Sequence, residues 1–163
     1  MPVDLSDYLD NLKREVNPPG TNLFPEATDT EYAGHLTDAF WEARLDGMLS
    51  DWTESDGVIA SVTDGGGDIS RDLVQLVILY AGIRIVRNHL RNIRTAFRAK
   101  AGSTEYETQQ SAQLLRDILD ELRQKRSLVL QRLSDLGKID SYVLDALYER
   151  DYSIRRGDTD WWR

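Results

Sequence analysis

The apolar pattern between residues 69 and 137 constrains the fold more than any other feature of this sequence. From residue 73 to residue 97, apolar side chains return every three or four positions, which is the spacing of one face of an α-helix. These side chains are Leu73, Leu76, Val77, Tyr80, Ile83, Val86, Leu90, Ile93 and Phe97. At a rise of ~1.5 Å per residue, such a helix keeps one face buried over about 40 Å. The pattern therefore predicts a long helix that lies in a hydrophobic core.

A second long helix is expected directly after the first. Gly102 supplies a C-terminal stop, and Thr104 with Glu107 has the spacing of an N-terminal capping box. The apolar pattern then resumes at Leu115, Ile118, Leu122, Val129, Leu133 and Leu136, and ends at Gly137. Because the connection is so short, the two helices must lie antiparallel. The sequence thus predicts an all-α helical bundle built on a hairpin that spans residues 69–137.

Two shorter helices are expected before the hairpin. Asp4 is a plausible N-cap for a helix that carries Leu5, Tyr8, Leu9 and Leu12, and "NPPG" at 17–20 ends it. Thr28 and Glu31 have capping-box spacing for the next helix. Its apolar stripe is Tyr32, Leu36, Ala39, Phe40 and Ala43, with an extension toward Leu49. A short extended segment at Val58–Val62 and a hinge loop at Gly65, Gly66 and Gly67 then lead into the hairpin.

The pattern changes after Gly137, so we expect a helical-bundle domain at 1–137 and a separate segment at 138–163. A short helix capped by Asp140 would place Val143, Leu144 and Leu147 on one side. The last dozen residues have no period and form an extended C-terminal arm that ends in Trp161 and Trp162. Two large rings on a polar tether are typical of a docking segment, although such a tail can also fold back on its own helices.

Charge is distributed very unevenly along the chain. Residues 1–72 carry 16 acidic and 4 basic side chains, whereas residues 73–100 carry 6 basic side chains and no acidic one. The basic residues recur at helical spacing along one flank: Arg84, Arg87, Arg91, Arg94, Arg98 and Lys100. This flank can pair with acidic faces, either in its own chain or in a neighbouring copy. It can also face DNA, but the interleaved aromatics of single-strand binders and a short recognition helix are both missing.

The sequence shows little catalytic chemistry. Cysteine is absent, no Gly-x-Ser-x-Gly elbow occurs, and "DGGGD" lacks the Lys and Ser/Thr of a phosphate-binding loop. His35 shares a helix face with Glu31 and Asp38, a spacing that can bring three metal ligands together, but an exposed polar face on an acidic helix explains it more simply. We therefore expect no enzyme, no cofactor and no metal, with a small helical enzyme or metal protein built on His35 as the alternative.

His89 lies among the arginines, so we expect it at the edge of the hairpin or at an interface. No apolar run approaches the roughly 20 residues that a bilayer requires, and no targeting signal is evident. The sequence predicts a soluble protein that does not contact membranes.

Three stretches carry a resemblance to a known family. They are "DLSDYLDNLKREVNPPGTNLFPEATDTEYAGHLTDAFWEARLDGML", "LYAGIRIVRNHLRNIRTAFRAKAGSTEYETQQSA" and the closing aromatic tail. Together they resemble the head-to-tail adaptor (head–tail connector) proteins encoded by long-tailed phages of actinobacteria. The resemblance spans nearly the whole chain and is densest at residues 77–112, but it includes no catalytic motif.

The resemblance implies a structural role in the virion neck. Such adaptors are helical bundles that assemble, usually as twelve copies, into a ring beneath the portal. The ring extends the DNA channel and offers a platform for the stopper or head-completion protein. The implied partners are thus further copies of this chain, the portal protein and the stopper, with assembly in the cytoplasm of the host bacterium. Genomic DNA would pass through without specific binding, because acidic walls repel phosphate.

The resemblance also suggests roles for particular residues. In related adaptors the C-terminal arm reaches the portal, which assigns docking to Arg155, Arg156, Trp161, Trp162 and Arg163. Part of the acidic surface of residues 1–72 would line or rim the channel, and the arginine flank would be used between subunits. A DNA-binding helical regulator that uses the Arg84–Lys100 helix is the alternative function.

Overall fold

The computed structural model describes residues 2–19, 21, 23–24, 27–62, 68–99, 105–137, 139, 143–145 and 147, with the side chains of all of these except 94–99 and 105–110. The protein is mostly helical and is built on two long antiparallel helices, which confirms the predicted fold class. A small three-stranded sheet is also present. Several predicted features lie outside the described residues: the hinge loop at Gly65–Gly67, the stop at Gly102, the cap at Asp140 and the C-terminal arm with its tryptophans.

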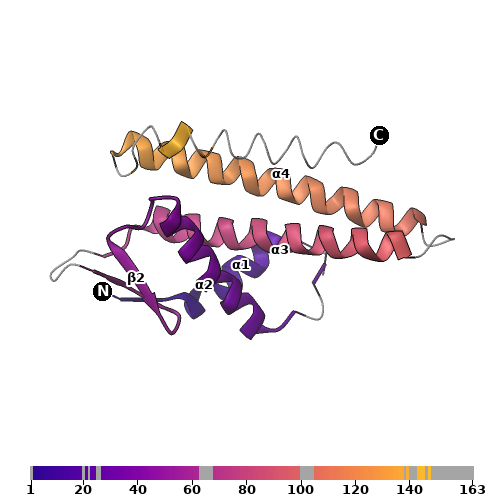
Figure 1. Ribbon diagram of the computed structural model, residues 1–163, viewed down its shortest axis with the longest axis horizontal. Coiled ribbons are helices and arrows are strands. Elements are labelled where there is room, and N and C mark those ends of the chain that lie inside the picture. Colours follow the sequence, from indigo (N-terminus) through magenta and orange to yellow (C-terminus); the bar gives the residue numbers. More distant parts are fainter. Residues whose placement is uncertain are drawn as a thin grey trace.

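The hairpin consists of α3 (Arg71–Ala99) and α4 (Glu105–Asp135), which pack along each other as Figure 1 shows. The predicted apolar face of α3 is buried from Leu73 to Val86, and Leu115, Leu122 and Leu133 of α4 are also buried. The prediction for Leu136 is wrong, because its side chain is 58% exposed. The helix has already ended at Asp135, and the following turn, with Gly137 at φ +66°, directs Leu136 to solvent.

The chain begins with a strand, β1 (Val3–Asp4), a 3₁₀ helix, η1 (Leu5–Tyr8), and then α1 (Leu9–Val16). Asp4 is the N-cap, as predicted, since its Oδ1 accepts a hydrogen bond from the Ser6 amide at 2.8 Å. The first turn that it caps is 3₁₀ rather than α-helical.

The next helix, α2 (Asp29–Leu45), begins at the predicted capping box. The Glu31 amide donates to Thr28 Oγ1 at 3.3 Å, and the Thr28 amide donates to Glu31 Oε2 at 2.7 Å. All five residues of the predicted apolar stripe are buried. The helix does not extend toward Leu49, because it ends at Leu45 and Gly47 then adopts φ +85°. Leu49 is nonetheless buried, from the turn that follows.

Two of the three strands of the sheet lie between α2 and the hairpin in the sequence. The strands β2 (Trp52–Ser55) and β3 (Val58–Ser61) form an antiparallel hairpin, with β1 on the other side of β3. Asp56 and Gly57 connect them at φ +53° and +84°, as Asp-Gly does in tight hairpin turns. The predicted extended segment is thus confirmed as β3. The other two strands were not predicted, because β1 has only two residues and "WTES" lacks alternation.

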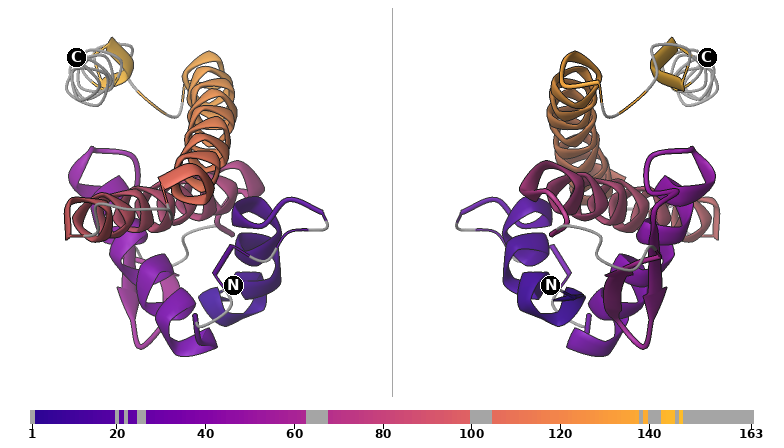
Figure 2. Two further views of the ribbon diagram at one scale, coloured as in Figure 1. Left: turned by 90° about the vertical axis from the view of Figure 1, so that its right-hand side faces the viewer. Right: turned by 90° about the vertical axis from the view of Figure 1, so that its left-hand side faces the viewer.

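The elements form layers around α3, with α4 on one side and the N-terminal elements on the other (Figures 1 and 2). Helices α1 and α2 both pack against α3 and lie on opposite sides beneath it in Figure 2. Gly82 permits a close approach of two neighbouring helices: a Cβ there would lie 3.3 Å from Leu122 Cδ1 and 3.4 Å from Val16 Cγ1. Glycine at this position therefore lets α4 and α1 pack tightly on the same turn of α3.

Within the part of the chain that the structure describes, one helical segment, Arg71–Ile93, is long and apolar enough by composition to cross a membrane. This corrects the expectation that no segment approaches that length. However, 67% of its most apolar window is buried inside the protein. Its apolar character is accounted for by its central position between α1, α2 and α4.

The described residues beyond the hairpin return to the N-terminal layer. Leu147 is buried in the common core, and Val143 and Leu144 pack against it, as their predicted common side requires. Val143 reaches the turn after α2, where its Cγ2 lies 3.8 Å from the position of a Cβ on Gly47.

Candidate functional site

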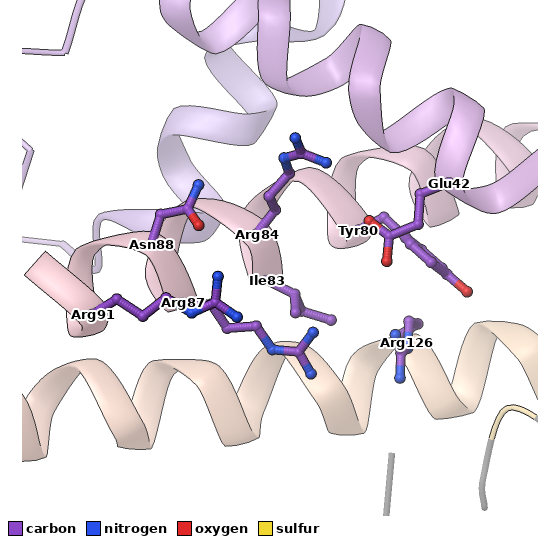
Figure 3. A pocket seen from close by; sticks show the side chains of 8 residues that line it. All are labelled: Glu42, Tyr80, Ile83, Arg84, Arg87, Asn88, Arg91 and Arg126. Carbon is purple, nitrogen blue, oxygen red and sulfur yellow. The ribbon is translucent and has the colours of Figure 1, made fainter. Parts of the chain in front are cut away.

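A hollow of about 280 Å³ lies where α2, α3 and α4 meet, and Figure 3 shows the side chains that line it. Glu42 comes from α2 and Arg126 from α4. The remaining lining residues come from successive turns of α3: Tyr80, Ile83, Arg84, Arg87, Asn88 and Arg91. Three arginines of the predicted basic flank therefore share one concave site. The side chains of the other two, Arg94 and Arg98, lie outside the described residues.

Arg84 is held by its own chain. Its Nη2 lies 2.8 Å from Oδ2 of Asp38, on α2, and the two side chains are 40% and 52% exposed. An ion pair this exposed adds little stability, but it fixes the direction of the guanidinium toward α2, as Figure 3 shows. Arg84 thus pairs with an acidic residue of its own chain, which is one of the two kinds of pairing expected from the sequence.

Tyr80 forms the base of the hollow. Its ring is buried, and its hydroxyl donates a hydrogen bond of 2.9 Å to Oδ2 of Asp46, the C-cap residue of α2. The guanidinium carbon of Arg126 lies 5.0 Å from the centre of the same ring, within the range of a cation–π contact. Arg126 is only 2% exposed. Tyr80 consequently links α2, α3 and α4 and packs against the buried guanidinium of Arg126 in the lining of the hollow.

Arginine is the most frequent side chain in the lining of the hollow. Besides Arg84, which is directed to Asp38, the lining includes Arg87, Arg91 and Arg126, together with the carboxylate of Glu42. Arg87, Arg91 and Arg126 also interact with other groups of the chain, so their charges are not free.

The three candidate metal ligands are not brought together. Glu31 closes the capping box of α2, and Asp38 pairs with Arg84. Burial lowers the pKa of His35, as does the nearby positive charge of Arg84, while Asp38 and Glu31 act in the opposite direction. His35 Nδ1 is buried without a hydrogen-bond partner. Among the described residues, no group of three His, Cys, Asp or Glu side chains has a geometry that could hold a metal ion.

His89 packs against the N-terminal layer. Its ring meets that of Phe24 edge to face, with 4.9 Å between the centroids, and burial lowers its pKa. Sequence reasoning placed His89 at an edge of the hairpin, and the structure shows the contact that covers it.

A second charged contact joins α4 to α1 at a distance from the hollow. Lys125 Nζ lies 2.8 Å from Glu15 Oε2 and 3.0 Å from Glu121 Oε1. Burial alone would lower the pKa of Lys125, but the hydrogen bonds to Glu15 and Glu121 outweigh it, so the pKa is raised. This cation is satisfied within the chain and serves packing.

Sequence reasoning missed Tyr80, Glu42 and Arg126 as parts of this site. Tyr80 was assigned only to the core, which is correct for its ring but leaves out its hydroxyl. Arg126 carried a signal, because it lies four residues after Leu122 and four before Leu130, inside the buried stripe of α4. An arginine in an apolar stripe needs partners, and the amino-acid pattern alone is enough to reveal that need.

Comparison of this chain with known protein families, curated proteins and solved structures found no match. These comparisons therefore place the chain in no known family. The docking arm (Arg155, Arg156, Trp161, Trp162 and Arg163) and the hinge glycines lie outside the described residues, so their assigned roles stay predictions.

Proposed function

We propose that this protein is a head-to-tail adaptor, a structural protein of the phage neck. In this role its copies form a ring under the portal, extend the DNA channel, and offer a platform to the stopper or head-completion protein. The proposal rests on the resemblance of the sequence to such adaptors and on the fold class that this role implies.

One observation carries the proposal. The same chain has an arginine-lined hollow between α2, α3 and α4 and a strong excess of carboxylates in residues 1–72. A closed ring of identical subunits needs two different surfaces that complement each other, because each copy contacts its neighbour head to tail. Opposite charges on the two surfaces would steer the copies together and fix their register.

The acidic surface also suits a DNA channel. Asp7, Asp51 and Asp56 are all exposed carboxylates of the N-terminal layer. A wall of this kind repels phosphate, so that DNA slides without being retained. The C-terminal arm would attach the ring to the portal, with Trp161 and Trp162 as anchors.

The test is to mix the purified protein with a portal ring and image the particles by electron microscopy. We expect a second ring stacked on the portal. Deletion of residues 158–163 should abolish the stacking but leave the thermal stability of the free protein unchanged. If the deletion instead destabilises the protein and leaves portal binding intact, the arm packs on its own helices.

The competing function is a DNA-binding regulator. Salt-sensitive retention of the purified monomer on duplex DNA would support this alternative, because neutralised phosphates release counterions.

A further inference from the structure

An ion pair between α2 and α3 lies beside a half-buried histidine. The ion pair joins Asp38 of α2 to Arg84 of α3, and the histidine is His35, three residues before Asp38. We propose that the three side chains form a proton-sensitive link: Arg84 holds Asp38 while His35 is neutral, and the link loosens when His35 takes up a proton. The inference concerns the contact between α2 and α3 and does not depend on the adaptor role.

The three side chains lie close enough to act on one another. Residues three apart on a helix are neighbours, at roughly 5–6 Å between Cβ atoms, so Asp38 lies next to His35 on α2. From α3, Arg84 reaches the same place, because its Nη2 lies 2.8 Å from Asp38 Oδ2. Figure 3 shows the Arg84 guanidinium directed toward α2. His35 and Arg84 therefore share one carboxylate neighbour.

His35 has a nitrogen that suits only the neutral ring. Its Nδ1 is buried and has no hydrogen-bond partner. A neutral imidazole can carry its hydrogen on Nε2, so that Nδ1 needs no acceptor. Protonation places a hydrogen on Nδ1 as well, and a buried N–H without an acceptor is costly. The protonated ring therefore requires a carboxylate or another acceptor close to Nδ1.

Two carboxylates on the same face of α2 are near His35, and one of them is already occupied. Glu31 Oε2 accepts hydrogen bonds from the Thr28 amide at 2.7 Å and from Thr28 Oγ1 at 3.1 Å, which closes the capping box. Asp38 is the other, and its bond to Arg84 joins two side chains that are 52% and 40% exposed. Because both side chains reach solvent, they can move without opening the core. A protonated His35 thus competes with Arg84 for Asp38.

Charged groups on the other elements that pack on α2 are engaged elsewhere or lie at the surface. Lys13 of α1 lies 2.6 Å from Asp29, at the start of α2. Glu54 of β2 accepts a hydrogen bond of 2.9 Å from Trp41 Nε1, and Asp7 of η1 is exposed. The pKa of the histidine responds to none of these groups, so the link involves the α2 carboxylates and the α3 arginine alone.

Acid is the condition that loosens the link. Burial and the charge of Arg84 both lower the pKa of His35 from the ordinary value of 6.5. The ring is therefore neutral at about pH 7, where the link is intact. As the pH falls through the lowered value, His35 gains a charge of the same sign as Arg84, and one carboxylate must serve two cations. Arg84, which lines the hollow, then loses part of its hold on α2.

Titration of both histidines by NMR tests the coupling in the full-length chain. We expect R84Q to raise the pKa of His35 by roughly half a pH unit or more, because a nearby positive charge is removed. D38N should lower this pKa, because a negative charge that favours the protonated ring is lost. His89 is the internal reference, since burial alone lowers its pKa and neither variant should change it.

The matched control is R71Q, which makes the same change as R84Q on the same helix. Arg71 is exposed at the first residue of α3, more than three turns from Arg84. Its charge is screened by solvent at that distance, so R71Q should leave the pKa of His35 within about 0.1 pH unit of the wild type.

Hydrogen exchange tests whether the contact loosens. Protection factors are compared between about pH 7.5 and a pH about one unit below the measured pKa of His35. In the wild type, the protection of α2 amides relative to α4 amides should fall about threefold or more over this range. In H35Q the side chain takes up no proton, so α2 should keep its protection. In D38N the link is absent at both pH values, so the fall should also be missing.

Three results would overturn the inference. One is a pKa of His35 that is the same in R84Q, D38N and the wild type. Another is protection of α2 that does not fall in the wild type after His35 has titrated. The third is a fall in H35Q equal to that of the wild type. None of these measurements involves the portal, so their failure would leave the proposed adaptor function standing.

Discussion

The N-terminal layer and the helix hairpin differ in how deeply their charged side chains are buried. In the layer formed by η1, α1, α2 and the sheet, no carboxylate is fully buried among the described residues, and some cap helix ends, as Asp4 and Glu31 do. In the hairpin, Arg123 and Arg126 are almost fully buried, at 5% and 2% exposure. Exposed acidic charges such as Asp51 can therefore be changed with little effect on the fold, whereas some basic charges are part of the core.

The largest effect should follow from R126E, which tests whether the buried charge is structural. The substitution removes the cation over the Tyr80 ring and places a carboxylate close to Glu42 in a region with little water. Breaking a buried charged contact costs roughly 3–5 kcal/mol. Urea denaturation should show this loss of unfolding free energy.

R132E is the matched control for that experiment, because it makes the same change on the same helix. Arg132 is 64% exposed and pairs with Asp72 at 3.1 Å. An exposed pair contributes about 1 kcal/mol or less to stability, so the urea concentration at the midpoint of unfolding should change little. Equal losses in the two variants would contradict the contrast between buried and exposed arginines.

A smaller effect is expected from T28A, in the N-terminal layer. Thr28 Oγ1 accepts the Glu31 amide and closes the start of α2. Loss of an N-cap side chain costs about 1 kcal/mol. Thermal denaturation measures the change, and T30A, in the same turn but without a role in the cap, should leave the melting temperature nearly unchanged. If T28A melted at the same temperature as the wild type, α2 would be stabilised by its packing against α3 and not by the cap.

The smallest expected effect is the pH dependence of stability that arises from the two histidines. Burial lowers the pKa of both His35 and His89 from the ordinary value of 6.5, so the unfolded chain binds protons at a higher pH than the folded one. Their contribution to stability is complete above pH 6.5 and is lost as the pH falls through 6.5 toward the lower folded pKa values.

Unfolding measured between about pH 7.5 and about pH 5.5 should show this slope, because the carboxylates of Asp4 and Glu31 titrate only at lower pH. H35Q should flatten it, and the loss of stability should be smaller than in T28A. A slope of opposite sign would mean that a partner raises the pKa of one histidine.

The fold was largely predictable, because its main signals are local. The period of three to four residues in α3 and α4 and the Thr28–Glu31 capping box need no information from distant parts of the chain. The sheet was only partly predictable, since the pairing of Val3 with Ile59 joins residues that are 56 positions apart. A two-residue strand has no period, and only its partner defines it.

Several residues of the site could be predicted from the sequence, but their arrangement could not. The helical spacing indicated that Arg84, Arg87 and Arg91 share a flank, and they do line one hollow. The spacing could not show which of these arginines pairs with which group, because Asp38 and Arg126 come from other helices. Only the packing of α2 and α4 on α3 decides that Arg84 turns to Asp38 and that Arg126 joins the lining.

Gly82 lies on α3 at a point where α4 packs from one side and α1 from the other. Leu122 of α4 and Val16 of α1 both approach the position of the missing Cβ, so a larger side chain at Gly82 would press on both helices. A single substitution at this position would therefore disturb the packing on both sides of α3 at once.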